Sequence, residues 1–166
     1  MAAKTSSPIF PAPDHDHGRC SADALAHAEA LCTARGQRLT PIRRRVLEML
    51  AASHRTLGAY EIMDRLAGEG PRPAPITVYR ALDFLLENGL VHRIESRNAF
   101  LACIATHHEA EAATTVFLIC ERCGAVGESA SPDVAASLQT AARAAGFSPH
   151  SRVIEITGVC RHCREG

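Results

Sequence analysis

The sequence predicts an α+β protein in two parts, and three observations lead to this fold class. Residues 21–88 repeat their apolar side chains at the three- and four-residue spacing of amphipathic helices. Residues 90–103 then alternate in two short runs, as β-strands do. Further along, β-like runs enclose one helical run, with a C-x-x-C pair near each end. The expected organisation is a disordered tail (1–20), a first domain (21–103), a hinge (104–113) and a second domain (114–166).

Composition indicates an ordinary soluble globular protein. The chain has 166 residues, of which 46% are hydrophobic and 22% are charged. No apolar run approaches the roughly 20 residues that span a bilayer, and the N-terminus lacks the apolar core of a signal peptide. We therefore expect a cytoplasmic protein with no membrane partner. The seven cysteines favour metal or redox chemistry over structural disulfides in that compartment.

Three helices are expected before residue 70. The N-terminal tail shows no periodicity and is rich in proline, serine, aspartate and histidine, as disordered segments are. The first helix is expected to begin at the cap Ser21 and to end at Gly36. The second begins at Thr40 and Pro41, since threonine is a good cap and proline is tolerated in a first turn. The third covers the run YEIMDRLAG.

A fourth helix and a hairpin complete the first domain. The helix is expected over residues 76–88, because Pro75 and Thr77 mark its start and Asn88-Gly89 marks its end. Two strands follow, LVHRIE and AFLAC, joined by the polar turn SRN. Helices followed by a small hairpin are the outline of a winged helix. In that fold the helix over residues 76–88 would enter the major groove of DNA.

The second domain is too small to bury much apolar surface. The runs TTVFLIC, GAVGES and RVIEITGVC predict strands, and an alanine-rich helix is expected from Pro132 to Gly146. A unit of this size usually needs a metal or a partner to be stable.

Two cysteine pairs provide such a metal site. Each C-x-x-C pair chelates zinc from a tight turn, and two pairs complete a tetrahedral Cys₄ site. The strand–helix–strand prediction fits between the two pairs. A structural zinc is therefore expected on four thiolates, those of Cys120, Cys123, Cys160 and Cys163.

A second set of ligand-type residues lies around the hinge: His92, Cys103, His107, His108 and Glu128. Each has an ordinary alternative as a surface, loop or core residue. Together, two histidines, a cysteine and a carboxylate would give a four-coordinate zinc that ties the two domains together. Closed coordination leaves no position for a water molecule, which favours sensing over catalysis. The expectation is therefore a protein that is not an enzyme and has no small-molecule substrate.

The sequence resembles the Fur family of metalloregulators, in particular its zinc-uptake-regulator (Zur) branch. The motifs that carry the resemblance are RLTPIRRRVLEML, AYEIMDRL, ITVYRALDFLLENGLVHRIES, FLICERCGAVGE and the terminal CRHC. They cover roughly residues 21–163. The resemblance implies a homodimeric, zinc-responsive repressor of zinc-uptake genes that binds operator DNA. It also implies a winged-helix DNA-binding domain followed by an α/β dimerisation domain.

The resemblance also implies the metal ligands. Zinc would occupy two sites per chain, a structural Cys₄ site and a regulatory site on His92, Cys103, one hinge histidine and Glu128. The segment between Cys103 and Cys120 is longer than the pattern common in the branch. We prefer His108 as the hinge ligand, with His107 as the alternative.

DNA contacts are expected from two groups of residues. The resemblance places Tyr79 and Arg80 at the start of the reading helix, with Tyr60 as an additional contact, although Tyr79 has partial packing against the wing as its alternative. The densest basic cluster in this chain of zero net charge is Arg43, Arg44 and Arg45. With Thr77, these arginines are expected to contact phosphates.

Other functions compete with this interpretation. Iron- or manganese-responsive regulation is one, although the chain lacks the His-His-Asp-x-His run of the iron branch and the soft ligand Cys103 favours zinc. A thiol or peroxide sensor is another. A zinc deaminase is disfavoured, because Ile119 stands where that signature requires a proline before its cysteine pair.

Overall fold

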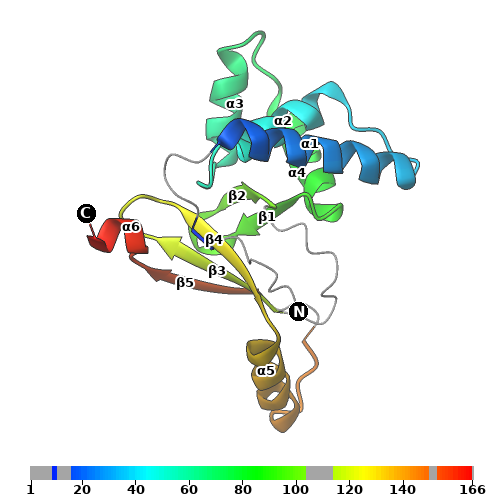
Figure 1. The fold of residues 1–166 in the computed structure, drawn as a ribbon. Helices are drawn as coiled ribbons and strands as arrows, with labels where there is room; N and C mark the ends of the chain where they lie inside the picture. Colours follow the sequence, from blue (N-terminus) through cyan, green and yellow to red (C-terminus); the bar gives the residue numbers. More distant parts are fainter. Residues whose placement is uncertain (1–8, 11–15, 104–113, 150–152, 166) are drawn as a thin grey trace, which may run out of the picture. The chain divides into compact units, whose positions relative to one another are not determined.

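The computed structural model describes residues 9–10, 16–103, 114–149 and 153–165, and the chain divides into two compact units. One unit spans Asp16–Ile104, and the other combines Met1–His15 with Ala105–Gly166. Each unit contains helices and a small sheet, so the predicted α+β class is confirmed (Figure 1).

The N-terminal unit is a helical bundle followed by a two-stranded wing. Its helices are α1 (His17–Ala34), α2 (Pro41–Ala51), α3 (Ala59–Ala67) and α4 (Pro75–Glu87). The wing consists of β1 (Val91–Ile94) and β2 (Ala99–Ala102), which pair antiparallel with Val91 opposite Ala102. A 3-10 turn, Glu95–Arg97, joins them, and Asn98 closes the turn in the left-handed region at φ 46°.

The first helix begins earlier than the expected cap at Ser21. Asp16 is the N-cap, and its carboxylate accepts a hydrogen bond from the backbone N–H of Arg19 at 3.2 Å. Residues 16–20, which were expected in the tail, therefore belong to the N-terminal unit. Thr40 does precede α2 with extended backbone, yet its hydroxyl makes no capping bond within the described residues. Pro41 at the first helical position is the stronger start signal there.

The core of this unit fixes α4 against its neighbours. Buried side chains come from all four helices and from the wing, including Val46, Ile62, Val78 and Leu85. At the end of α4, the Arg35 guanidinium donates to Asn88 Oδ1 at 2.9 Å. Asn88 Nδ2 in turn donates to the carbonyl oxygen of Phe84 at 2.9 Å. This buried amide ties the C-terminal ends of α1 and α4 together.

The C-terminal unit is built on a three-stranded sheet. Its elements are β3 (Thr114–Cys120), β4 (Val126–Ser131), α5 (Pro132–Ala144), β5 (Val153–Gly158) and α6 (Arg161–Glu165). The strand order is β4-β3-β5, with β3 antiparallel to β4 and parallel to β5. The three strands and the long helix lie where the sequence predicts them, whereas α6 was not predicted.

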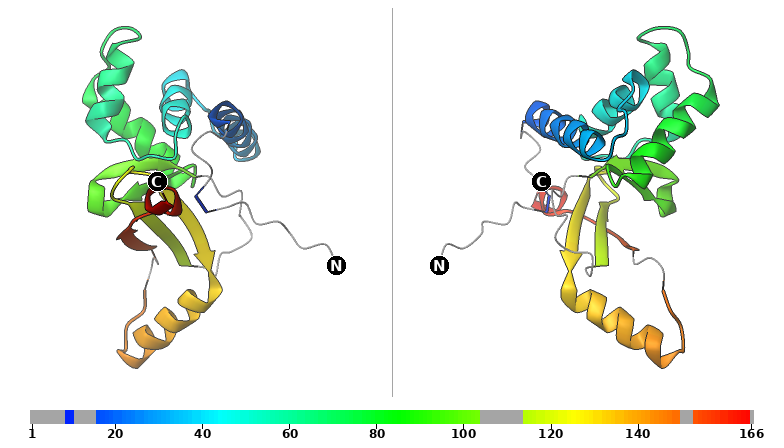
Figure 2. Two further views of the ribbon diagram at one scale, coloured as in Figure 1. Left: turned by 60° about the vertical axis from the view of Figure 1, so that its left-hand side comes forward. Right: turned by 90° about the vertical axis from the view of Figure 1, so that its right-hand side faces the viewer.

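No residue separates β4 from α5 in the sequence, and Figure 2 shows the strand continuing directly into the helix. Ser131 is both the last residue of the strand and the N-cap of the helix. Its hydroxyl accepts a hydrogen bond from the backbone N–H of Val134 at 3.4 Å. The helix therefore starts where the strand ends, with no loop between them.

Two residues of the N-terminal segment, Ile9 and Phe10, lie against β4. A Cβ atom on Gly127 would stand 2.5 Å from Ile9 Cγ2 and 2.8 Å from the Ile9 carbonyl oxygen. Only glycine leaves room for this approach. The other residues of the expected tail before Asp16 lie outside the described part of the chain.

Among the helices that the structure describes, none is long and apolar enough to cross a membrane.

Candidate metal centre and nucleic-acid interface

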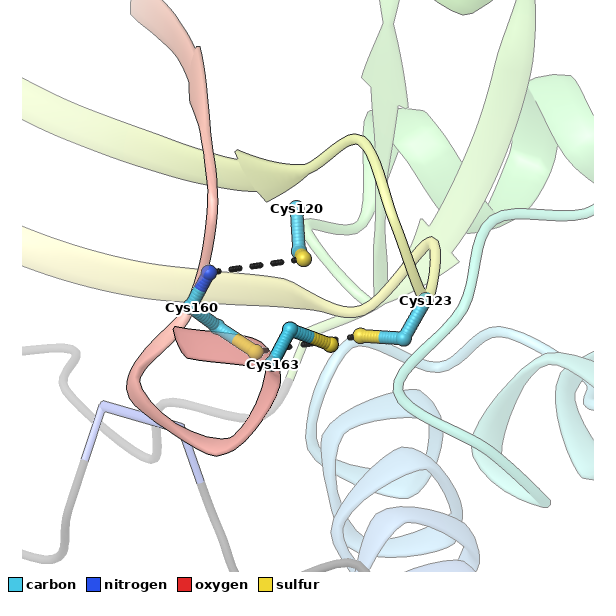
Figure 3. A group of neighbouring side chains, drawn as sticks. All are labelled: Cys120, Cys123, Cys160 and Cys163. Carbon is cyan, nitrogen blue, oxygen red and sulfur yellow. Dashed lines mark hydrogen bonds between the residues drawn. The ribbon is translucent and has the colours of Figure 1, made fainter. Parts of the chain in front are cut away.

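The four predicted cysteines converge at one end of the C-terminal sheet. Cys120 ends β3 and Cys123 lies in the turn that follows, while Cys160 and Cys163 stand just before and within α6. Because β3 and β5 are parallel neighbours, the segments that follow them leave the sheet at the same end, the carboxyl end of both strands. Their side chains point toward one another from the two segments (Figure 3).

The geometry of this cluster fits a tetrahedral metal ion. The four Sγ atoms lie within 4.8 Å of one another, and those of Cys123 and Cys160 are 3.8 Å apart. A tetrahedral zinc with Zn–S bonds of about 2.3 Å sets its sulfur atoms about 3.8 Å apart. Cys120 and Cys160 are buried, which keeps these thiolates from water. The donor set and its spacing therefore match a structural Cys₄ zinc site.

Backbone amides prepare one thiol for this role. The N–H groups of Cys123 and Cys160 lower the pKa of the Cys120 thiol to about 6, and the N–H of Cys160 lies 3.4 Å from its sulfur. The neighbouring Cys123 thiol, followed by burial, raises the pKa of Cys163 to about 12. Four crowded thiols do not all ionise unaided, so a divalent cation is the natural neutralising partner.

Arg122 joins the two cysteine turns and was not foreseen. Its guanidinium donates to the carbonyl oxygen of Cys163 at 2.6 Å. The first turn closes at Gly124, which has a φ of +73° and whose N–H donates to the Cys120 carbonyl at 3.0 Å. A glycine after a cysteine pair was the available sequence signal for the turn, but no local pattern indicates the partner of Arg122.

The described residues of the predicted regulatory site belong to both units, two to the N-terminal unit and one to the C-terminal unit. His92 lies on β1 opposite Leu101, and Cys103 follows β2, where its N–H donates to the Leu90 carbonyl at 3.0 Å. Strand alternation puts Cys103 and His92 on the same face of the wing as diagonal neighbours. Glu128 lies on β4 of the C-terminal unit, opposite Phe117. His107 and His108 lie outside the described residues.

The expected base-reading residues are exposed on two helices of the N-terminal unit. Thr77, Tyr79 and Arg80 lie on the exposed side of α4, and Tyr60 is exposed near the start of α3. Within the described chain, none of these four side chains has a hydrogen bond or an ion pair. Arg80 is therefore available to an external acceptor.

The arginines of α2 are engaged differently. Arg44 pairs with Glu29 and with Glu48, and Arg45 pairs with Glu48 and Glu69. The Arg45 guanidinium holds the pKa of the Glu69 carboxyl below its usual value. These contacts neutralise much of the charge of the basic cluster.

Arg43, by contrast, has no carboxylate partner in the described chain and contacts a backbone carbonyl and an aromatic ring. It donates to the Arg38 carbonyl at 2.7 Å, and its guanidinium carbon lies 3.5 Å from the centroid of the Phe84 ring on α4. Such a cation–π contact links α2 to α4. The predicted phosphate contacts of Arg43, Arg44 and Arg45 stay predictions.

Comparison with known proteins gives a consistent result. The chain is 41% identical to the zinc uptake regulation protein of Escherichia coli strain K12 over 143 residues, 86% of this chain and 82% of that protein. Among solved structures, a zinc uptake regulator complexed with zinc and DNA matches with a TM-score of 0.79 and 40% identity over 87% of this chain and 95% of that one. The holo form of XcZur matches with a TM-score of 0.75 and 42% identity over 87% and 99% of the two chains.

The family model agrees with these relatives. The model described as the ferric uptake regulator family matches residues 34–157, which include α4, the wing and the first cysteine pair. The resemblance inferred from the sequence motifs is thereby confirmed. The chain belongs to the ferric uptake regulator family.

Proposed function

We propose that this chain is a zinc-responsive transcriptional repressor that binds operator DNA and controls zinc-uptake genes. The observation that carries the proposal is its likeness, over most of both chains, to a zinc uptake regulator complexed with zinc and DNA. The exposed, unengaged side chains of Tyr79 and Arg80 on α4 support the DNA-binding part. The Cys₄ cluster supports the zinc part.

The DNA-binding part assigns different tasks to the helices. Arg80 would donate to the O6 and N7 atoms of guanine in the major groove, since a guanidinium makes two parallel hydrogen bonds there. Tyr79 and Tyr60 would contact the same groove. Thr77 and the basic cluster on α2 would contact phosphates and set the register of the helix on the duplex.

Regulation would come from a second zinc on His92, Cys103, His108 and Glu128, with His107 as the alternative hinge ligand. His92 and Cys103 belong to the N-terminal unit and Glu128 to the C-terminal unit. Ligands from both units would fix the angle between them once they share one ion. The two reading helices of a dimer would then meet half-sites about one helical turn apart. The chain would hold two zinc ions, one structural and one regulatory.

The C-terminal unit would form the homodimer. β5 is an edge strand of the sheet, and its Val153 and Ile156 side chains are exposed. Of α5, only Ala135 is buried, while Leu138 and the following Phe147 are exposed. An edge strand and an apolar helix face in such a small unit are natural partners for a second copy. The protein would act in the cytoplasm, without catalysis and without a small-molecule substrate.

Operator binding titrated against free zinc tests the proposal. Zinc and DNA affinities of a metal-dependent repressor are coupled by about 1–3 kcal/mol, which is about 5- to 150-fold. We expect Cys103→Ser to keep the structural zinc but to lose most of this zinc response. Cys20→Ser, outside both proposed sites, is the matched control and should respond as the wild type does.

Three results would contradict the proposal. A Cys103→Ser variant with an unchanged zinc response would refute the regulatory site. A wild type that responds to iron or manganese but not to zinc, or that releases DNA on mild peroxide treatment while it keeps its zinc, would favour the competing sensors.

A further inference from the structure

The N-terminal unit exposes large apolar side chains on two of its helices, α3 and α4. Within residues 16–103 they are Tyr60, Ile76 and Tyr79, which are 70%, 58% and 40% exposed. Tyr60 stands near the start of α3, and the other two stand in the first turns of α4. Single exposed apolar residues need no explanation, but Ile76 and Tyr79 lie on the same side of α4 as Arg80, and such a group is typical of a contact surface. Ile76 is the member to which no role has been given so far.

Ile76 lies at the centre of the exposed face of α4. An α-helix turns by about 100° per residue, so Ile76 points about 180° away from the buried Leu85. By the same count it lies about 40° from Arg80 and about 60° from Tyr79. An apolar residue at the border of the buried stripe would contribute to the core. Ile76 stands opposite that stripe.

The helix itself gives no reason for an isoleucine at this position. Ile76 is the second residue of α4, after Pro75, and the N-cap is Ala74. A hydrophobic staple would pair Pro73 with the buried Val78, so it does not use Ile76. Isoleucine is also a weaker helix former than alanine. The side chain therefore serves neither the core nor the start of the helix.

We propose that Ile76 reads a thymine in each operator half-site by packing on its C5-methyl group. The inference rests on the proposed DNA-binding function and adds a specificity determinant to it. The edges of base pairs in the major groove offer hydrogen-bond donors and acceptors, and the thymine methyl is the apolar group among them. A branched aliphatic side chain recognises that methyl and no polar edge. With Arg80 next to it, α4 would read a guanine and a nearby thymine from adjacent positions of one face.

The test uses the zinc-loaded full chain and duplexes that the wild type selects from a randomised pool. Each thymine of the selected duplex is replaced in turn by deoxyuridine, which lacks only the methyl group. One position per half-site should weaken wild-type binding about three- to ten-fold, the range expected for loss of one apolar contact to a base. At that position Ile76→Ser should bind thymine and deoxyuridine duplexes equally well.

Ile76→Ser and Ile76→Val are a matched pair of variants. Serine and isoleucine have similar helix propensities, so the exposed position should tolerate the change without loss of fold. Ile76→Val keeps the branched apolar surface and should retain most of the preference for thymine. The double-mutant cycle between residue and methyl group isolates the pairwise contact.

The outcomes separate this inference from the function on which it rests. If the wild type binds a selected duplex in a zinc-dependent manner but no deoxyuridine position couples to Ile76, the thymine contact is refuted and the repressor function stands. If the wild type selects no duplex at any zinc concentration, the proposed function itself is wrong. An equal loss of affinity for Ile76→Ser and for the wild type, when deoxyuridine replaces thymine, would also overturn the contact.

Discussion

At the scale of single residues, the cysteine cluster depends on groups that are not ligands. The backbone amides that point at Cys120 favour its thiolate, and Arg122 joins the first cysteine turn to the carbonyl of Cys163. Groups around the ligands hold the sulfur atoms in place and tune their protonation. The structural metal site therefore includes the backbone of the cysteine turn and Arg122 as well as the four sulfur atoms.

Cys160→Ser should remove the structural zinc and unfold the C-terminal unit. Binding of structural zinc contributes on the order of 10 kcal/mol in small domains, which is as much as the whole stability of many of them. The zinc content per chain should fall by one equivalent, and amide protons of β3 and β5 should exchange rapidly with solvent. Cys20→Ser should leave both measurements unchanged. A Cys160→Ser protein with full zinc content and protected strands would contradict the site.

At the scale of elements, α2 and α4 use their arginines in opposite ways. Arg44 and Arg45 are occupied by three glutamates, Arg43 covers the Phe84 ring, and Arg80 has no partner within the described chain. An arginine that already has carboxylate partners gains less from a phosphate than a solvated one does. The arginines of α2 are therefore expected to contribute less to phosphate binding than unpaired arginines would.

Arg80→Ala should weaken operator binding more than Arg45→Ala. Loss of a two-bond contact to guanine costs about 1–3 kcal/mol and relaxes the preference at that base pair. Arg45→Ala should weaken binding to all duplexes alike and make the dependence on salt less steep. Binding measured at several salt concentrations, on selected and on scrambled duplexes, distinguishes the two patterns. Equal and sequence-independent losses for both variants would contradict these roles.

The elements that the sequence predicts well are those with local signals. The strand TTVFLIC, the helix after Pro132 and the cysteine spacing are each legible within a few residues, and the structure contains all three. The start of α1 was misplaced because Ser21 and Asp16 are both good caps, and only the observed hydrogen bond to Arg19 decides between them. The short helix α6 has no periodicity to detect.

Long-range partners explain the rest of what the sequence did not predict. Arg44 meets Glu29 and Arg45 meets Glu69, residues that lie 15 and 24 positions away in the sequence. Such pairs depend on how helices pack, which no short motif encodes. The expectation that the basic cluster contacts phosphates therefore did not include its carboxylate partners, whereas the cysteine site was found because each half is local.

At the scale of the whole molecule, the exposed face of β5 and α5 is the part of the C-terminal unit that most needs a second copy. The sheet has three strands, and several large apolar side chains of this unit are open to solvent. Association would bury them and lengthen the sheet. The repressor would then present two reading helices to one operator.

Ile156→Glu should convert the proposed dimer to a monomer, because a carboxylate on an edge strand opposes pairing with another strand. Analytical ultracentrifugation of the zinc-loaded protein measures the change, and operator affinity should fall with it. Ile76→Glu is the matched control, since that isoleucine is comparably exposed but belongs to the other unit. It should stay dimeric. A dimeric Ile156→Glu protein would place the interface elsewhere.

The direct junction of β4 and α5 has a mechanical consequence. Ser131 ends the strand and caps the helix, and Glu128 stands three positions before it on the same strand. Because no linker separates β4 from α5, the orientation of the helix depends directly on the end of the strand. One residue inserted into the first turn of α5 would turn the rest of the helix by about 100° relative to β4 and shift it by about 1.5 Å. Because no loop lies between them, a partner that moves α5 would also move the end of the strand that carries Glu128.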